Sequence, residues 1–381
     1  MKERVMANAD FLALLRGFVL DERPKTGERL EICELWSCAA RQNLLPVLAY
    51  LNKKWNILDD ADLTKRLDSA LYAAVSGSVN RCEAFGRLSE RLSEEGVAHM
   101  PVKGYYLREL YPEPELRTFG DIDVLIRTDD REKADRLMRV LGYAAMQDWE
   151  PSYSYIRGAE YYELHTNLMD CDLDGRADMR EYFSRAWEHA VPAEGLRYAP
   201  ETEFHFIYIV CHLAKHLYGG GAGMRMYLDV AMLLRRCGEE MDWDYIEREF
   251  EELRLTAFFH TVMNAVRVWF GVECCCALPE PDGEILGALL EYTLSADLFG
   301  HLRDRSAVKI RNSGEKTGET VIKNMLFPSA DALERRYTFL KKRRWLLPLA
   351  WIVRLFANLR LVPARLRELK RVSETSGAQV E

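Results

Sequence analysis

The sequence lacks several features that would place it in a specialised class of proteins. It contains no stretch of 18 uncharged apolar residues, the approximate length of a membrane-spanning helix. Its start lacks the pattern of a secretory signal, because Arg16 interrupts an apolar patch that already follows an acidic residue. No internal repeat is evident. We therefore expect a cytoplasmic protein without a signal peptide or a transmembrane helix.

Cysteine pairs with metal-ligand spacing are also missing. The nine cysteines are odd in number, and no two of them form a C-x-x-C pair. A disulfide framework is not expected in a long chain with an ample core, and the cysteine usage fits a reducing compartment. The run from Cys274 to Cys276 could bind a soft metal only with distant partners, so we expect buried or half-buried thiols there.

The composition is that of a globular protein with an uneven distribution of charge. Of the 381 residues, 48% are hydrophobic and 29% are charged, which allows a large core in two or three domains. The net charge is −8, yet residues 331–372 contain twelve Lys and Arg against three Asp and Glu. Such a basic segment is typical of a surface that contacts an anionic partner.

Hydrophobic periodicity predicts two helical regions around a short mixed region. Helices are expected over residues 10–95, with Gly96 as a stop, and again from Thr202 onward. Between them the pattern predicts strands at 97–104 and 121–126, and a helix over 130–143 that ends at Gly142. The last two predicted strands form a hairpin with Gly158 in its turn, over residues 152–168. This order predicts an α+β fold with a small mixed sheet.

Two aspartates at the start of the predicted strand 121–126 are the clearest candidates for chemistry. Asp121 and Asp123 are two residues apart, so a strand places both side chains on one face. Two carboxylates so close repel each other unless a cation lies between them. Mg²⁺ is commonly held by one or two carboxylates together with substrate phosphates. The pair therefore indicates a site for Mg²⁺ and a triphosphate, although two solvated carboxylates at a strand end would show the same pattern.

The flanking residues favour the functional interpretation. Lys103 and Gly104 lie between a strand and a helix, where a lysine and close-approaching backbone N–H groups can bind phosphate. Arg117 could orient carboxylates or phosphate. Glu163 and His165 share one face of the second hairpin strand, so Glu163 could be a third carboxylate, as a metal ligand or a general base.

These residues together resemble a poorly characterised family of bacterial nucleotidyltransferases within the polymerase-β-like superfamily. The resemblance is strong over residues 97–170 and weaker to about residue 240. The family pattern is Lys-Gly, a Tyr-Pro turn, an arginine, Asp-h-Asp, a helix ending in Gly-Tyr, and a Glu-Leu-His strand. This sequence matches it at Lys103, Gly104, Tyr111, Pro112, Arg117, Asp121, Asp123, Gly142, Tyr143, Glu163 and His165.

The hydrophobic periodicity and this resemblance together predict a domain organisation. An N-terminal helical segment (1–95) precedes a nucleotidyltransferase α/β core (96–200), and a helical C-terminal domain with the basic tail follows (201–372), before a frayed terminus (373–381). The chain has Lys103-Gly104 where the wider superfamily usually has Gly-Ser. It also has a glutamate, Glu163, where much of the superfamily has aspartate.

The expected activity is Mg²⁺-dependent transfer of a nucleoside monophosphate from a nucleoside triphosphate (NTP) to an acceptor, with release of pyrophosphate. Mn²⁺ could replace Mg²⁺. Asp121, Asp123 and Glu163 are the expected catalytic and metal-binding residues. The expected nucleotide-binding residues are Lys103, Gly104, Arg117 and His165. The acceptor is open: a small molecule, a sugar, a protein or RNA.

Two alternative functions come from other features. The fold could serve as a non-catalytic nucleotide-binding or regulatory module. A metallohydrolase could use His212 and His216, which have metal-ligand spacing on a helix, although core or cleft-lining histidines are the more common case. The basic tail could lie on an anionic membrane or a nucleic acid, or pack on the body of the protein as an ordinary helix.

Overall fold

The computed structural model describes residues 2–27, 30–170, 178–219 and 221–295. Of these, residues up to 215 and residues 222–295 belong to one compact unit. The predicted basic tail and the terminus 373–381 lie outside the described residues. The domain boundaries inferred from the sequence stay predictions.

The N-terminal region is helical, as its hydrophobic periodicity predicts. Its longest helix begins where the Asp60 side chain accepts a hydrogen bond from the Leu63 N–H, and ends just before Gly96, whose φ is 70°. The predicted glycine stop is thereby confirmed. The helices are α1 (Lys2–Leu20), α2 (Ile32–Arg41), α3 (Leu45–Trp55) and α4 (Ala61–Glu94).

A five-stranded mixed sheet follows, in the order β1-β2-β5-β4-β3. Strands β2 and β5 are parallel, and every other neighbouring pair is antiparallel. Gly158, with φ of 60°, lies in the β4–β5 turn, so the predicted hairpin is confirmed. The strands are β1 (His99–Pro101), β2 (Ile122–Ile126), β3 (Ala144–Trp149), β4 (Ser152–Arg157) and β5 (Glu160–His165).

Short helical elements connect these strands. The predicted helix after β2 is present and ends next to Gly142, whose φ is 84°. The elements are α5 (Gly104–Leu107), α6 (Arg131–Val140), and the 3₁₀ turns η1 (Arg108–Leu110), η2 (Pro114–Leu116) and η3 (Thr128–Asp130). The α+β class expected from the sequence is thus confirmed.

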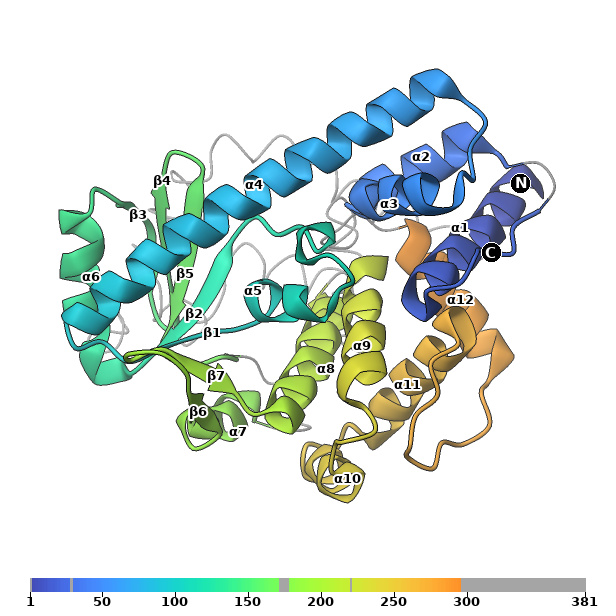
Figure 1. Cartoon of the computed structure of the whole chain (residues 1–381). Coiled ribbons are helices and arrows are strands. Elements are labelled where there is room, and N and C mark those ends of the chain that lie inside the picture. The colour runs from blue at the N-terminus through green and yellow to red at the C-terminus, as the bar shows by residue number, and fades with distance from the viewer. Residues whose placement is uncertain (1, 28–29, 171–177, 220, 296–381) are drawn as a thin grey trace, which may run out of the picture. The chain divides into compact units, whose positions relative to one another are not determined.

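One face of the sheet is apolar and is covered by helices α4 and α6 (Figure 1). Alternate residues of β2 and β5, such as Val124 and Leu164, are completely or almost completely buried there. They pack against Phe85 and Leu88 of α4 and Met138 of α6 in one cluster. Because side chains alternate along a strand, the intervening residues of β2 and β5 point to the opposite face. The polar residues of β2 and β5 therefore lie on the face opposite α4 and α6.

The C-terminal half of the described chain is again mostly helical, as predicted from Thr202 onward. A two-stranded ribbon precedes these helices. The elements are α7 (Met179–Ser184), η4 (Arg185–Trp187), β6 (Ala190–Pro192), β7 (Tyr198–Pro200), α8 (Thr202–Gly219), α9 (Met224–Cys237), α10 (Trp243–Glu252), α11 (Thr256–Phe270) and α12 (Gly283–Ser295). In the described ranges, no helix is both long and apolar enough to cross a membrane.

The structure differs from the sequence-based expectations in its short or edge strands and at the cysteine run. The ribbon strands β6 and β7 were not expected. Strand β3 was not expected, because it is a sheet edge whose residues, among them the exposed Met146, show no clear apolar alternation. Cys274 and Cys276 form a disulfide, and the Cys275 thiol between them is exposed, so the expectation of buried or half-buried thiols is wrong for all three residues. This disulfide joins two cysteines only two residues apart, and it does not link distant parts of the chain.

The two valines at Val124 and Val140 test how much the central strand contributes to stability. Val124 is completely buried in β2, whereas Val140 at the end of α6 is 80% exposed. We expect Val124→Ala to lower the free energy of unfolding by about 1.5–3 kcal/mol. Val140→Ala, the matched control, should change it by less than about 0.5 kcal/mol. Urea unfolding of both variants measures the difference, and equal losses would contradict this description of the core.

Candidate active site

The polar face of the sheet brings two acidic residues side by side. In the parallel pair β2–β5, Asp123 lies opposite Glu163, and Leu125 lies opposite His165. His165 is two residues beyond Glu163 and so projects from the same face. Asp123 and His165 are both buried, while Glu163 is half-buried. The strand register thus assembles three chemically active side chains from two strands.

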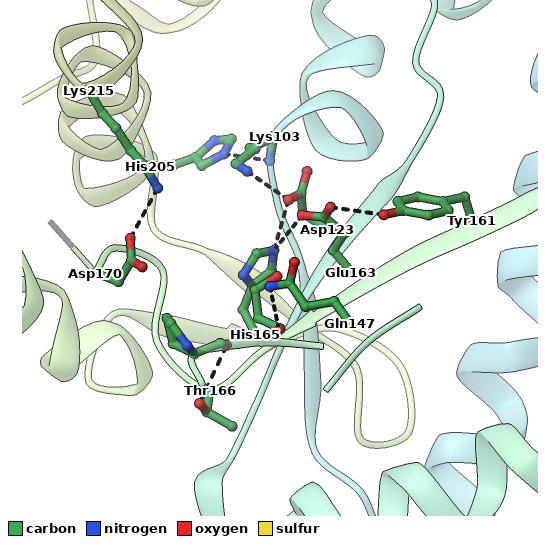
Figure 2. Close-up of polar contacts among 12 residues, drawn as sticks. Lys103, Asp123, Gln147, Tyr161, Glu163, His165, Thr166, Asp170, His205 and Lys215 are labelled. Carbon is green, nitrogen blue, oxygen red and sulfur yellow. Dashed lines mark hydrogen bonds and ion pairs between the residues drawn. The ribbon is translucent and has the colours of Figure 1, made fainter. Parts of the chain in front are cut away.

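Two donors converge on a single oxygen of Asp123 (Figure 2). Its Oδ1 accepts a hydrogen bond from the Lys103 Nζ at 2.7 Å and is 2.9 Å from the His165 Nε2. Burial by itself would raise the pKa of Asp123, but the Lys103 ammonium and the His165 hydrogen bond outweigh it. The pKa of Asp123 is therefore well below its usual range, and this residue stays ionised.

The two neighbouring carboxylates show the opposite shift. Burial, followed by the negative charge of Asp123, raises the pKa of Glu163 and likewise that of Asp121. The Glu163 Oε2 lies 3.7 Å from the His165 Nε2, and the Tyr161 hydroxyl donates to the Glu163 Oε1 at 3.5 Å. A cation placed among these groups would relieve their mutual repulsion.

Three of these residues can bind a metal ion together. Each of Asp123, Glu163 and His165 offers a ligand atom, and these atoms all lie within 4.8 Å of one another. Two carboxylates suit Mg²⁺ or Mn²⁺, and an imidazole nitrogen is a ligand that Mn²⁺ also accepts. The donor set therefore fits a divalent cation. Asp121, which directly precedes β2, is outside this three-residue group but close enough to Asp123 for its charge to matter.

Lys103 reaches the site from a strained backbone position. Its φ of 52° and ψ of −125° lie in a region that glycine adopts far more readily than lysine. The Lys103 N–H donates to the His205 Nε2 of α8 at 3.2 Å. Burial lowers the pKa of His205 to about 3, so its ring is a neutral acceptor. The backbone N–H of Lys103 is thus already used by His205.

Gly104 is required by the close approach of Arg117. A Cβ atom at residue 104 would lie 3.0 Å from the Arg117 Nη1 and 3.1 Å from the Phe119 Cβ. The glycine of the Lys-Gly pair therefore makes room for a buried guanidinium. Sequence reasoning had explained the same glycine by the approach of phosphate.

Arg117 is held by an aspartate from a distant helix. Its Nε and Nη2 donate to the two carboxylate oxygens of Asp229 in α9, both at 2.7 Å, and its Nη1 donates to the Thr118 carbonyl. The Tyr111 hydroxyl donates to the same Asp229 at 2.8 Å. Arg117 and Asp229 are both buried. The structure thus gives Arg117 a partner within the protein and ties the segment before β2 to α9.

Sequence reasoning missed the importance of Asp229. Asp229 lies four residues after Arg225 on α9, which is the spacing of an ordinary helix pair. Its ion pair is nevertheless with Arg117, and Arg225 donates to the Thr118 carbonyl at 2.8 Å. The available signal was the segment MRMYLDVAMLL, which resembles an Arg-x-x-x-Asp helix of the bacterial nucleotidyltransferase family that the sequence resembles. Nothing in the spacing could match Asp229 with an arginine 112 residues earlier.

The histidines of α8 do not form a metal site within the described part of the chain. Among those residues, the group of three or more metal-ligating side chains is Asp123, Glu163 and His165, and it includes neither His212 nor His216. His205 instead accepts the hydrogen bond from the Lys103 backbone. The geometry thus favours the carboxylate site over the histidine helix.

The structure thus combines a small mixed sheet, adjacent acidic residues on its polar face and a lysine beside them, the combination that the sequence led us to expect for a nucleotidyltransferase. The comparison with protein families agrees with this class. The chain belongs to a family described as uncharacterised nucleotidyltransferases, whose model matches residues 28–271. The match includes α2–α4 and extends to the end of α11. The comparisons with curated proteins and with solved structures gave no match.

Removing Asp229 should destabilise the protein strongly. The Asp229→Ala change leaves the buried Arg117 guanidinium without its carboxylate, which typically costs about 3–5 kcal/mol of unfolding free energy. The control Glu83→Ala removes an exposed pair with Arg87 on α4 and should cost less than about 0.5 kcal/mol. Chemical denaturation compares the two, and a small effect at Asp229 would show that the buried pair does not hold this segment.

The space around Gly104 can be tested with a second glycine as control. Gly104→Ala should lower the unfolding free energy by about 1–3 kcal/mol, because the added methyl group meets Arg117 and Phe119. Gly86→Ala in α4 meets no atom within 4 Å and should raise it by about 0.5–1 kcal/mol. Thermal or urea unfolding should show changes of opposite sign in the unfolding free energy of the two variants. A stabilising Gly104→Ala would contradict the close approach of Arg117.

Proposed function

We propose that this protein is a divalent-metal-dependent nucleotidyltransferase that transfers a nucleoside monophosphate from an NTP to an acceptor and releases pyrophosphate. The observation that carries the proposal is the pairing of Asp123 with Glu163 across parallel strands, with His165 beside them. Membership in the nucleotidyltransferase family supports the same class of reaction. Experiments are needed to identify the preferred nucleobase of the NTP and the acceptor.

Asp123, Glu163 and His165 would hold a divalent ion, Mg²⁺ or Mn²⁺, with Asp121 as a further carboxylate beside them. When bound, such an ion supplies positive charge to the triphosphate and to the leaving pyrophosphate. Asp123 suits the role of a permanent anionic ligand because its pKa is lowered by Lys103 and His165, against the effect of burial. Lys103 and the Gly104 backbone are the proposed phosphate contacts.

Glu163 is the proposed general base. In the transfer step, an oxygen of the acceptor forms a bond to the α-phosphorus while the bond from that phosphorus to the α,β-bridging oxygen breaks. The proton of the acceptor hydroxyl passes to the Glu163 carboxylate, and pyrophosphate leaves. A carboxylate has two oxygens, so Glu163 can hold the ion through one oxygen and accept the proton on the other.

Arg117 is assigned a supporting role in this proposal. Its guanidinium occupies both oxygens of Asp229 and lies against Gly104, next to Lys103. It therefore fixes the position of the Lys103–Gly104 segment relative to β2. Phosphate binding by Arg117 would require it to leave Asp229, at the cost of a buried unpaired charge.

Pyrophosphate release tests the proposal directly. The full chain is incubated with Mg²⁺ or Mn²⁺, each of the four NTPs and a cell extract as the source of acceptor. We expect Asp123→Asn to abolish release and Glu163→Gln to lower it by about 10²–10⁴-fold. The matched control is Asp129→Asn, an exposed aspartate before α6, which should leave the rate unchanged.

Two other outcomes are informative. Full activity in Asp123→Asn would refute the proposed site. Tight, metal-dependent NTP binding by the unmodified protein, with no pyrophosphate release from any NTP, would identify a nucleotide-binding or regulatory module of the same fold.

A further inference from the structure

A positive charge is built into the acidic site. The Lys103 Nζ lies 2.7 Å from the Asp123 Oδ1, and the two side chains are only 18% and 7% exposed. The neighbouring Tyr208 ring of α8 lies 6.0 Å from the same ammonium, at the outer limit of a cation–π contact, and is completely buried. An ammonium enclosed in this way is a fixed part of the site rather than a mobile surface charge.

The backbone of Lys103 is held in a costly conformation that places this charge. A residue other than glycine is strained at φ 52° and ψ −125°, because its Cβ atom crowds the neighbouring backbone. Three hydrogen bonds hold the segment: the Lys103 N–H donates to His205, the Leu107 N–H donates to the Lys103 carbonyl, and the Val102 N–H donates to the Asp123 carbonyl. The strained residue is therefore the one that brings a positively charged side chain to Asp123.

We propose that the Lys103 ammonium takes the place of one of the two divalent ions of a two-metal phosphoryl-transfer site, so that this protein binds a single divalent ion. That ion would lie on Asp123, Glu163 and His165. The inference rests on the proposed function, because it concerns the metal requirement of the same site.

The geometry supports this assignment. In two-metal sites the ions are roughly 3.5–4 Å apart and share a carboxylate. Here the ammonium already occupies one side of the Asp123 carboxylate, at hydrogen-bond distance from the Oδ1. A second dication on that oxygen would meet the repulsion of a buried ammonium only a few ångströms away. The ammonium can also donate to a phosphate oxygen, since Asp123 uses only one of its three N–H groups.

The number of bound ions tests this inference independently of turnover. The full chain is titrated with Mn²⁺, alone and with inorganic triphosphate, the part that all four NTPs share, and bound Mn²⁺ is counted and characterised by electron paramagnetic resonance. We expect one ion per chain with a mononuclear spectrum. Lys103→Ala should bind two ions with a spin-coupled, dinuclear spectrum, and Lys103→Arg, which keeps the charge, should still bind one.

Lys103→Gly provides a second variant without the ammonium. It should also bind two ions, and it should melt about 1–3 °C above Lys103→Ala, because glycine relieves the positive φ. Circular dichroism checks that each variant is folded. Should Lys103→Ala fail to fold, Lys103→Gly replaces it in the comparison.

Three results would overturn the inference: two coupled ions in the unmodified protein, a single ion in both Lys103→Ala and Lys103→Gly, or no Mn²⁺ bound by the unmodified protein at millimolar concentration. Failure of the proposed function is distinguishable from these. Two ions together with pyrophosphate release would refute the single-ion site and leave the transferase intact. One ion without release from any NTP would leave the single-ion site intact and indicate a binding module.

Discussion

The site depends on one buried carboxylate, that of Asp123. An ionised aspartate with only 5% of its surface exposed is costly unless its charge is paired and hydrogen-bonded. Lys103 and His165 both provide that pairing at the same oxygen. Their convergence requires β1, β2 and β5 to be neighbours, because Lys103 follows β1, Asp123 lies on β2 and His165 ends β5. The strand order of the sheet thus decides whether the charge of Asp123 is paired.

The apolar face of the sheet makes this arrangement robust. Helices α4 and α6 cover Val124 of β2 and Leu164 of β5, which alternate along these strands with the polar residues of the site. A shift of either strand by one residue would therefore exchange its apolar and polar faces. The large cost of exposing that core therefore fixes which side chains face the site. The buried ion pair of Arg117 and Asp229 fixes the position of the segment between α5 and β2, because it attaches that segment to α9.

Much of the fold was predictable because its signals are local. Helix periodicity and a glycine stop defined α4, and the glycine turn defined the β4–β5 hairpin. The edge strand β3 and the short ribbon of β6 and β7 were missed, since their partly exposed residues carry no apolar alternation. The disulfide between Cys274 and Cys276 was missed for a different reason. Spacing alone does not decide whether two nearby thiols are joined.

For the site, the sequence by itself determined which residue types are available: the Asp-h-Asp strand start, the Glu-x-His strand and the Lys-Gly pair. It also determined that Glu163 and His165 share a face, because strand periodicity is local. Only the tertiary structure decided that Asp123 faces Glu163, that Lys103 lies on Asp123, and that Arg117 is held by Asp229. These pairings join residues from about 20 to more than 100 positions apart, and they are set by strand register and helix packing. The spacing of residues along the chain therefore could not predict these pairings.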